Sequence, residues 1–152
     1  MVIEVGSAAP DFTLKDNRGN MISLSSFKGK KVLLSWHPLA WTRVCADQMV
    51  SLEKNLQVFE GLNTESLGMS IDTHPSKNAW AKHLEIARVK LLCDFWPHGG
   101  VAQTYGLFRE VEGSSMRANV IVDEEGIVRW VKVYDIPQLP DIEEVIRALE
   151  KI

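Results

Sequence analysis

The strongest constraint on the fold is an apolar strand that runs directly into an amphipathic helix. The run KVLLSW at residues 31–36 suits a strand that is covered on both faces, and Pro38 ends it. Apolar residues then recur at helical spacing and predict a helix from Cys45 to about Gly61: Met49, Leu52, Leu56 and Phe59. The strand passes into the helix across residues 37–45, so this segment is the first half of a βαβ unit.

The remaining pattern completes one α/β domain. Residues 66–71 predict a second strand and residues 75–87 a second helix, with proline in its first turn. Further elements are expected in the order strand 89–92, short helix 100–105, strand 117–122, turn 123–126, strand 127–133 and helix 139–149. This order predicts a thioredoxin-like fold in which helices flank a central mixed β-sheet. An N-terminal β-hairpin at residues 12–24 adds to an edge, and the strand and short helix at 89–105 form a mid-chain insertion. No linker or repeat divides residues 1–152, so we expect a single domain.

Charge and hydropathy exclude two classes of partner. Seventeen Lys and Arg residues against 20 Asp and Glu leave a net charge of −3, which does not indicate the basic surface that nucleic acid requires. The apolar runs are only a few residues long, so no segment is expected to cross a membrane. The N-terminus has no basic residue ahead of an apolar stretch, so we expect no secretory signal and a cytoplasmic protein.

The junction between the first strand and the first helix carries a single cysteine. The segment WTRVC at residues 41–45 has the layout of a W-C-x-x-C loop in which Thr42 replaces the first cysteine. Dithiol exchange needs both sulfurs and is therefore excluded. Cys45 would still lie at a helix N-terminus, where unpaired N–H groups and the helix dipole favour a thiolate. A lone thiolate there is suited to attack an electrophile such as a peroxide O–O bond.

Several motifs resemble the peroxiredoxin (AhpC/TSA) family. The family pattern P-x-x-x-[T/S]-x-x-C is present as PLAWTRVC at residues 38–45. Four further segments are similar to those of family members: APDFTL (9–14), Leu24 with FKG (27–29), LLCDFWPHG (91–99), and Met116 with Arg117 at the start of a late strand. The likeness spans nearly the whole chain and is greatest to the one-cysteine types that resemble alkyl hydroperoxide reductase E, followed by the bacterioferritin-comigratory type.

The resemblance implies a thiol-dependent peroxidase and assigns a role to each motif residue. Cys45 would attack hydrogen peroxide or an organic hydroperoxide and become a sulfenic acid, Thr42 would orient the peroxide, and Arg117 would favour the thiolate and the departing oxyanion. Pro38 would shield the pocket from water, and Gln48 would orient Arg117. No cofactor is implied; the partners would be a small thiol or a thioredoxin- or glutaredoxin-type reductant, and a second copy of the chain in a homodimer.

Other residues keep more than one interpretation. His37 stands where relatives more often have an aromatic residue, so it either tunes the ionisation of Cys45 or only packs. Trp41 is the one tryptophan close enough in sequence to line the pocket. Cys93 is expected to be an inert buried thiol, with a resolving cysteine as the second interpretation. Two rival functions remain: a thioredoxin-fold redox sensor or chaperone, and a metal carrier that uses Cys45, His37 and Cys93.

Overall fold

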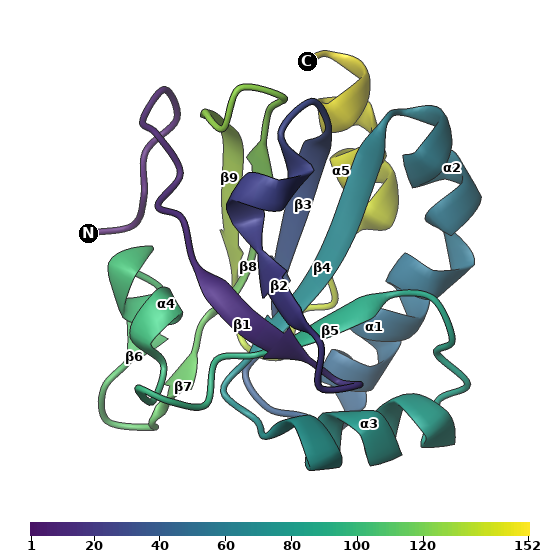
Figure 1. Cartoon of the computed structure of the whole chain (residues 1–152), viewed down its shortest axis with the longest axis vertical. Helices are drawn as coiled ribbons and strands as arrows, with labels where there is room; N and C mark the ends of the chain where they lie inside the picture. Colours follow the sequence, from purple (N-terminus) through teal and green to yellow (C-terminus); the bar gives the residue numbers. More distant parts are fainter.

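The computed structural model describes all 152 residues and contains a seven-stranded mixed sheet with the strand order β2-β1-β5-β4-β3-β8-β9 (Figure 1). The strands of this sheet are β1 (Thr13–Asp16), β2 (Met21–Ser23), β3 (Lys31–Trp36), β4 (Thr64–Ser70), β5 (Lys90–Cys93), β8 (Arg117–Val122) and β9 (Val128–Tyr134). The helices are η1 (Leu24–Phe27), α1 (Arg43–Lys54), α2 (Leu56–Gly61), α3 (His74–His83), α4 (Gly100–Thr104) and α5 (Ile142–Glu150). The strands β6 (Phe108–Arg109) and β7 (Ser114–Ser115) form a separate two-stranded ladder.

The strand pairing confirms the expected architecture. β3, β4 and β5 are parallel, whereas β8 runs antiparallel to β3 and β9 antiparallel to β8. β1 and β2 form the predicted hairpin, which joins the sheet edge through β5. β3 is buried at every position, as its uninterrupted apolar run predicts. The protein therefore has the mixed α/β architecture expected from the sequence.

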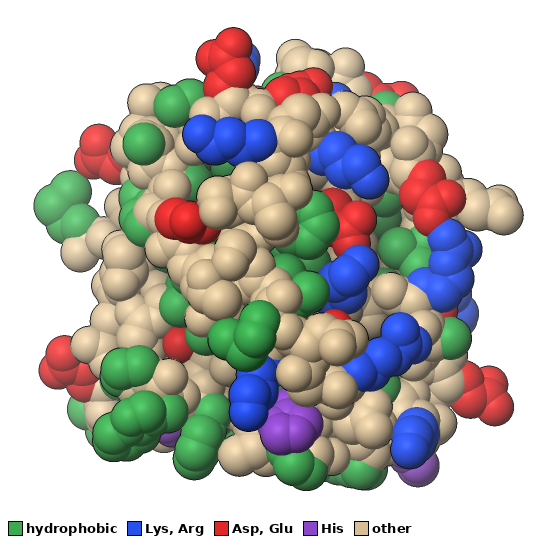
Figure 2. All heavy atoms as spheres, viewed as in Figure 1, with side chains coloured by type: hydrophobic (Ala, Val, Ile, Leu, Met, Phe, Trp, Pro, Cys, Tyr) green, Lys and Arg blue, Asp and Glu red, His purple; other side chains and the backbone are tan.

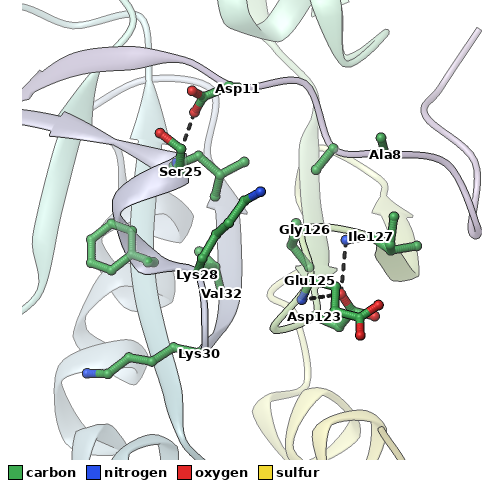
Figure 3. A pocket seen from close by; sticks show the side chains of 14 residues that line it. Ala8, Asp11, Ser25, Lys28, Lys30, Val32, Asp123, Glu125, Gly126 and Ile127 are labelled. Atoms are coloured by element: carbon green, nitrogen blue, oxygen red, sulfur yellow. Dashed lines mark hydrogen bonds between the residues drawn. The ribbon is translucent and has the colours of Figure 1, made fainter.

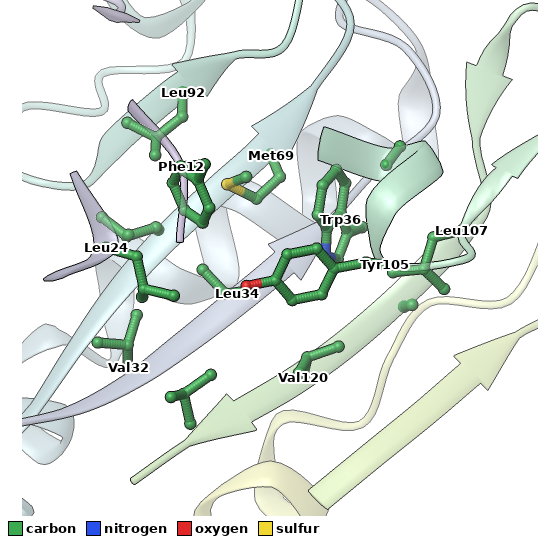
Figure 4. Packing of buried hydrophobic residues seen from close by; sticks show 14 of the residues in the cluster. Phe12, Leu24, Val32, Leu34, Trp36, Met69, Leu92, Tyr105, Leu107 and Val120 are labelled. Atoms are coloured by element: carbon green, nitrogen blue, oxygen red, sulfur yellow. The ribbon is translucent and has the colours of Figure 1, made fainter. Parts of the chain in front are cut away.

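Each face of the sheet has its own core. On one face Leu34, Met69 and Val120 pack with Tyr105, which follows α4, and with Phe12 of the N-terminal segment (Figure 4). On the other face alternate strand residues pack against α1, α2, α3 and α5. None of the helices has the length and apolar character needed to cross a membrane.

The helix expected over residues 139–149 begins at Ile142, after its N-cap Asp141. The two longest predicted helices are also shorter than expected, and each has a local cause. The helix expected over residues 45–61 is divided at Asn55, whose side chain donates to the Ser51 carbonyl and competes with the helical hydrogen bonds. The helix expected over residues 75–87 ends at His83 because Glu85 adopts a φ of 59°. The Ile86 N–H then bonds to the Ala81 carbonyl, which closes the helix in a Schellman turn. The β6–β7 ladder was not predicted.

Candidate active site

The loop between β3 and α1 leaves the first turn of α1 without a side-chain cap. Thr42 is the N-cap residue, but its hydroxyl donates to the Leu39 carbonyl at 2.7 Å instead of capping the helix. Cys45 is the third helical residue and is 1% exposed. The N–H groups of the first turn have no partner within the helix and are free to face an anion. This turn thus presents a buried thiol beside unpaired donors.

Arg117 brings a positive charge to this thiol from the neighbouring strand. It is the first residue of β8, is 2% exposed, and its Nη1 lies 3.5 Å from Cys45 Sγ. Its Nε and Nη2 both donate to the carbonyl of Ile136, at 3.0 and 2.7 Å. These two parallel bonds fix the guanidinium plane, so the charge at the sulfur is preorganised.

Gln48 supports Arg117 from α1. Its Oε1 accepts from Arg117 Nη1 at 2.8 Å, one turn after Cys45. Its Nε2 donates to Ser35 Oγ at 2.8 Å and to the Trp36 carbonyl at 3.0 Å, both on β3. Because arginine can only donate, this network determines which end of the Gln48 amide faces it. The side chain therefore ties α1, β3 and β8 together around the sulfur.

His37 and Pro38 follow β3 and are both buried. His37 Nε2 lies 2.7 Å from the ammonium of Lys77, and the imidazole ring packs 5.5 Å from the Trp80 ring. Burial, followed by the charge of Lys77, lowers the pKa of His37 well below its usual range. His37 is thus a neutral hydrogen-bond acceptor at physiological pH, which is consistent with packing in a polar layer.

Trp41 makes its contacts with α3. Its Nε1 donates to Ser76 Oγ at 3.1 Å, its ring lies 5.6 Å from that of His83, and 52% of the residue is exposed. Its φ of 69° lies in the left-handed region, which is uncommon for a residue other than glycine. Trp41 therefore holds the loop against α3, and that it also lines the pocket stays a prediction.

Cys93 occupies a different place on the sheet. It ends β5, and both cysteines are free thiols. β5 lies two strands from β3, a separation of roughly 10 Å in a sheet. Burial raises the pKa of Cys93 to about 11, so its thiol is neutral at physiological pH.

Cys93 lines a hollow of about 500 Å³ together with Phe95 and Trp96. These two aromatic side chains are 47% and 78% exposed. Figure 2 shows hydrophobic side chains gathered at the lower left of the molecule.

A second hollow, of about 250 Å³, lies far from Cys45 along β3. It is formed by the N-terminal segment, η1 and the β8–β9 turn, and Asp11, Lys28 and Asp123 surround it (Figure 3). Val32, near the start of β3, forms part of its wall, whereas Cys45 follows the other end of that strand.

No group of three or more His, Cys, Asp or Glu side chains is arranged to hold a metal ion, so Cys45, His37 and Cys93 are not gathered as ligands.

Sequence reasoning missed three contributors to the site. The Ile136 carbonyl holds Arg117, but any residue offers a carbonyl and no sequence signal marks this one. Lys77 and Asp72 lie in the segment after β4, and neither belongs to the motif. Lysine is rarely buried, so nothing in the pattern of α3 pointed to Lys77 except its place on the apolar side of the helix.

Comparisons with known proteins identify the family of the chain. The AhpC/TSA family model matches residues 5–131. Alkyl hydroperoxide reductase E of Mycobacterium tuberculosis is 38% identical over 133 residues, which cover 87% of this chain and 86% of that protein. A peroxiredoxin of Thermoplasma volcanium is 34% identical over 157 residues, which cover 100% of this chain and 76% of that protein. The reduced 2-Cys peroxiredoxin of Plasmodium vivax has a TM-score of 0.89 at 28% identity, with 97% of this chain and 81% of that chain covered.

Proposed function

The chain belongs to the AhpC/TSA family and is a thiol-dependent peroxidase, and we propose that it works by a one-cysteine mechanism centred on Cys45. The observation that carries this assignment is the guanidinium of Arg117, 3.5 Å from the Cys45 sulfur at an uncapped helix N-terminus. A fixed cation and free N–H groups favour a thiolate, which is the reacting form of cysteine. Cys93, the other thiol, ends a strand and has no helix N-terminus beside it.

In the proposed reaction the Cys45 thiolate attacks the terminal oxygen of the peroxide. The S–O bond forms as the O–O bond breaks, and the departing oxygen takes a proton and leaves as water or an alcohol. Arg117 and the first-turn N–H groups stabilise the negative charge on that oxygen. The Thr42 hydroxyl donates its proton to the Leu39 carbonyl and keeps two free lone pairs. Its oxygen therefore accepts a hydrogen bond from the peroxide O–H and orients the peroxide. Pro38, which offers no N–H, walls the pocket.

Reduction of the resulting sulfenic acid is proposed to need an external thiol. Cys93 is a neutral, buried thiol about two strand spacings away, and a disulfide requires Cβ atoms within about 3.5–4.5 Å. A small thiol, or a thioredoxin- or glutaredoxin-type protein, would form a mixed disulfide with Cys45, and a second thiol would release it. Because Cys45 is 1% exposed, a protein reductant reaches it only when the first turn of α1 opens locally.

Two further proposals concern assembly and location. The adjacent aromatic residues Phe95 and Trp96 are both exposed and support a homodimer that covers them. A patch of large apolar side chains on a protein surface often marks an interface. Analytical ultracentrifugation of the wild type and of Trp96→Ser tests this: a monomeric wild type contradicts it. The two free thiols support a reducing compartment, the cytoplasm.

The mechanism is tested by titrating the reduced protein with peroxide and mapping the products. One equivalent should add a single oxygen atom to the tryptic peptide of residues 44–54, which contains Cys45, and excess peroxide should add a second. A Cys45–Cys93 disulfide that is lost in Cys93→Ser would contradict the one-cysteine mechanism and make Cys93 the resolving residue. Stoichiometric consumption of peroxide in the presence of excess thiol would favour the redox sensor or chaperone instead of the enzyme.

A further inference from the structure

α3 contributes a buried cation behind the active-site loop. Lys77 is 0% exposed, and its Nζ lies 2.6 Å from Ser70 Oγ and 2.7 Å from His37 Nε2. Neither partner is an anion, and Lys77 takes part in none of the six ion pairs of the chain. The ammonium also lies 5.7 Å from the centre of the Trp80 ring, a cation–π contact. A charge enclosed in this way costs free energy, so its presence requires a compensating interaction.

The hydrogen bonds of Lys77 lead to the loop that precedes Cys45. Ser70 Oγ accepts from Lys77 and donates to Asp72 Oδ2 at 2.7 Å. The same Asp72 oxygen accepts from the backbone N–H of Ala40 at 2.9 Å. His37, the other partner of Lys77, is the first residue of this loop. Lys77 therefore holds the loop at two points, directly at His37 and through Ser70 and Asp72 at Ala40 (α3 lies below the loop in Figure 1).

The groups around Lys77 leave its charge without a full counter-ion. Burial lowers the pKa of Lys77 to about 8, so the side chain is a cation at neutral pH. Four titratable groups face Lys77: His37 after β3, Asp72 after β4, Cys93 of β5 and Cys45 of α1. Arg117 of β8 acts on His37. His37 is neutral, and the Cys93 thiol, with a pKa of about 11, is neutral too. The other two groups that face Lys77 are the Asp72 carboxyl and the Cys45 sulfur.

We propose that Lys77 is a second cation of the Cys45 site, a positioning residue that fixes the loop from behind and whose charge favours the Cys45 thiolate together with Arg117. The proposal rests on the proposed function of Cys45 as the reacting thiol. Arg117 approaches from β8, on one side of β3, whereas Lys77 acts from the β4 side through Ser70. The two buried cations are thus carried to the Cys45 loop from the strands on either side of β3.

The test is the pH profile of Cys45 alkylation in the full-length reduced protein. Iodoacetamide is reacted between pH 4.5 and 7, below the Lys77 pKa of about 8, so that Lys77 keeps most of its charge. Alkylation is read from the tryptic peptide of residues 44–54, separately from the Cys93 peptide of residues 91–109. In Lys77→Met the Cys45 alkylation rate at pH 6 should fall about tenfold, and the profile should move to higher pH. Lys82→Met, an exposed lysine on the same helix, is the matched control and should follow the wild type.

Two variants separate charge from shape. Lys77→Arg keeps a cation and should return the profile toward that of the wild type. Ser70→Ala cuts the connection to Asp72 and keeps the charge, so it should leave the profile in place and lower only the rate at its plateau. If Lys77→Met does not show a native circular dichroism melt, Lys77→Gln replaces it with the same expected shift.

Two results would overturn the inference. An unchanged profile in the folded neutral variant would show that Lys77 does not act on Cys45. A shift in Ser70→Ala equal to that in Lys77→Met would assign the effect to loop geometry alone. Either result leaves the wild-type profile and peroxide oxidation of Cys45 intact. If the proposed function itself were wrong, peroxide would add no oxygen to the 44–54 peptide of the wild type.

Discussion

Replacing Arg117 by alanine tests the electrostatic basis of the reaction. Its Nη1 lies 3.5 Å from Cys45 Sγ, and unit charges at that separation interact by about 5 kcal/mol at an effective dielectric constant of ~20 and by about 1 kcal/mol in water. Loss of one preorganised donor in enzymes costs about 2.7–4 kcal/mol, within that interval. We therefore expect Arg117→Ala to lower the rate constant for peroxide attack by about two orders of magnitude or more, and the thiolate to form only at higher pH.

The assay is stopped-flow oxidation of the reduced protein by hydrogen peroxide under single-turnover conditions. Arg117→Lys is the matched variant. It keeps the charge but cannot reproduce the two bonds to the Ile136 carbonyl together with the bond to Gln48. Its rate constant should therefore lie between those of the wild type and Arg117→Ala. Arg117→Ala leaves both acceptors without a donor, at about 1–3 kcal/mol each, so thermal melting must confirm that it is folded. A folded Arg117→Ala within threefold of the wild type, beside an inactive Cys45→Ser, would refute the reasoning.

Four further outcomes are expected. Thr42→Val keeps the shape and removes the hydroxyl, so peroxide attack should slow about tenfold with little change in Tm, and an unchanged single-turnover rate constant would exclude an orienting role. Gln48→Leu should slow the same step because Arg117 loses an acceptor, whereas Gln48→Glu should retain most of the rate; equal behaviour of the two variants would contradict this. Cys93→Ser should keep most of the turnover with dithiothreitol as the reductant, and loss of turnover would make Cys93 part of the cycle. The pKa of Lys77 is lowered by burial from 10.5 to about 8, so between these pH values the unfolded chain binds more protons and the free energy of unfolding should rise with pH. Urea denaturation should show a smaller rise in Lys77→Met, and identical slopes would mean that the lysine titrates normally in the folded protein.

Apart from the β6–β7 ladder and η1, the sequence was sufficient for the order of strands and helices because periodicity and turn residues are local signals. The run at 31–36 could only be a buried strand, and the stripe of Met49 and Leu52 required a helix that packs on the sheet. Helix ends were less predictable. Asn55 divides the first helix through a side-chain bond to the backbone of Ser51, a competition that hydrophobic periodicity does not register.

The site was predictable only where a motif marked it. Cys45 and Thr42 could be singled out from the segment itself, because their spacing from Trp41 places a thiol at a helix start. Arg117 could be proposed only through the family resemblance, since nothing in residues 116–122 says which strand lies beside it. Lys77 had no such marker: a lysine on a helix is normally solvated, and its burial depends on where α3 packs.

The functional side chains share one face of the sheet, and this follows from strand register. Leu34, Met69 and Ala118 belong to the core on the α4 face, so the residues adjacent to them in β3, β4 and β8 point to the face that α1 and α3 cover. Those neighbours are Ser35, Ser70 and Arg117, the partners of Gln48, Lys77 and Cys45. A shift of one residue in the β3–β8 pairing would turn Arg117 into the apolar core and remove its charge from the sulfur. The apolar residues that hold the β3–β8 register therefore also determine where the positive charge meets Cys45.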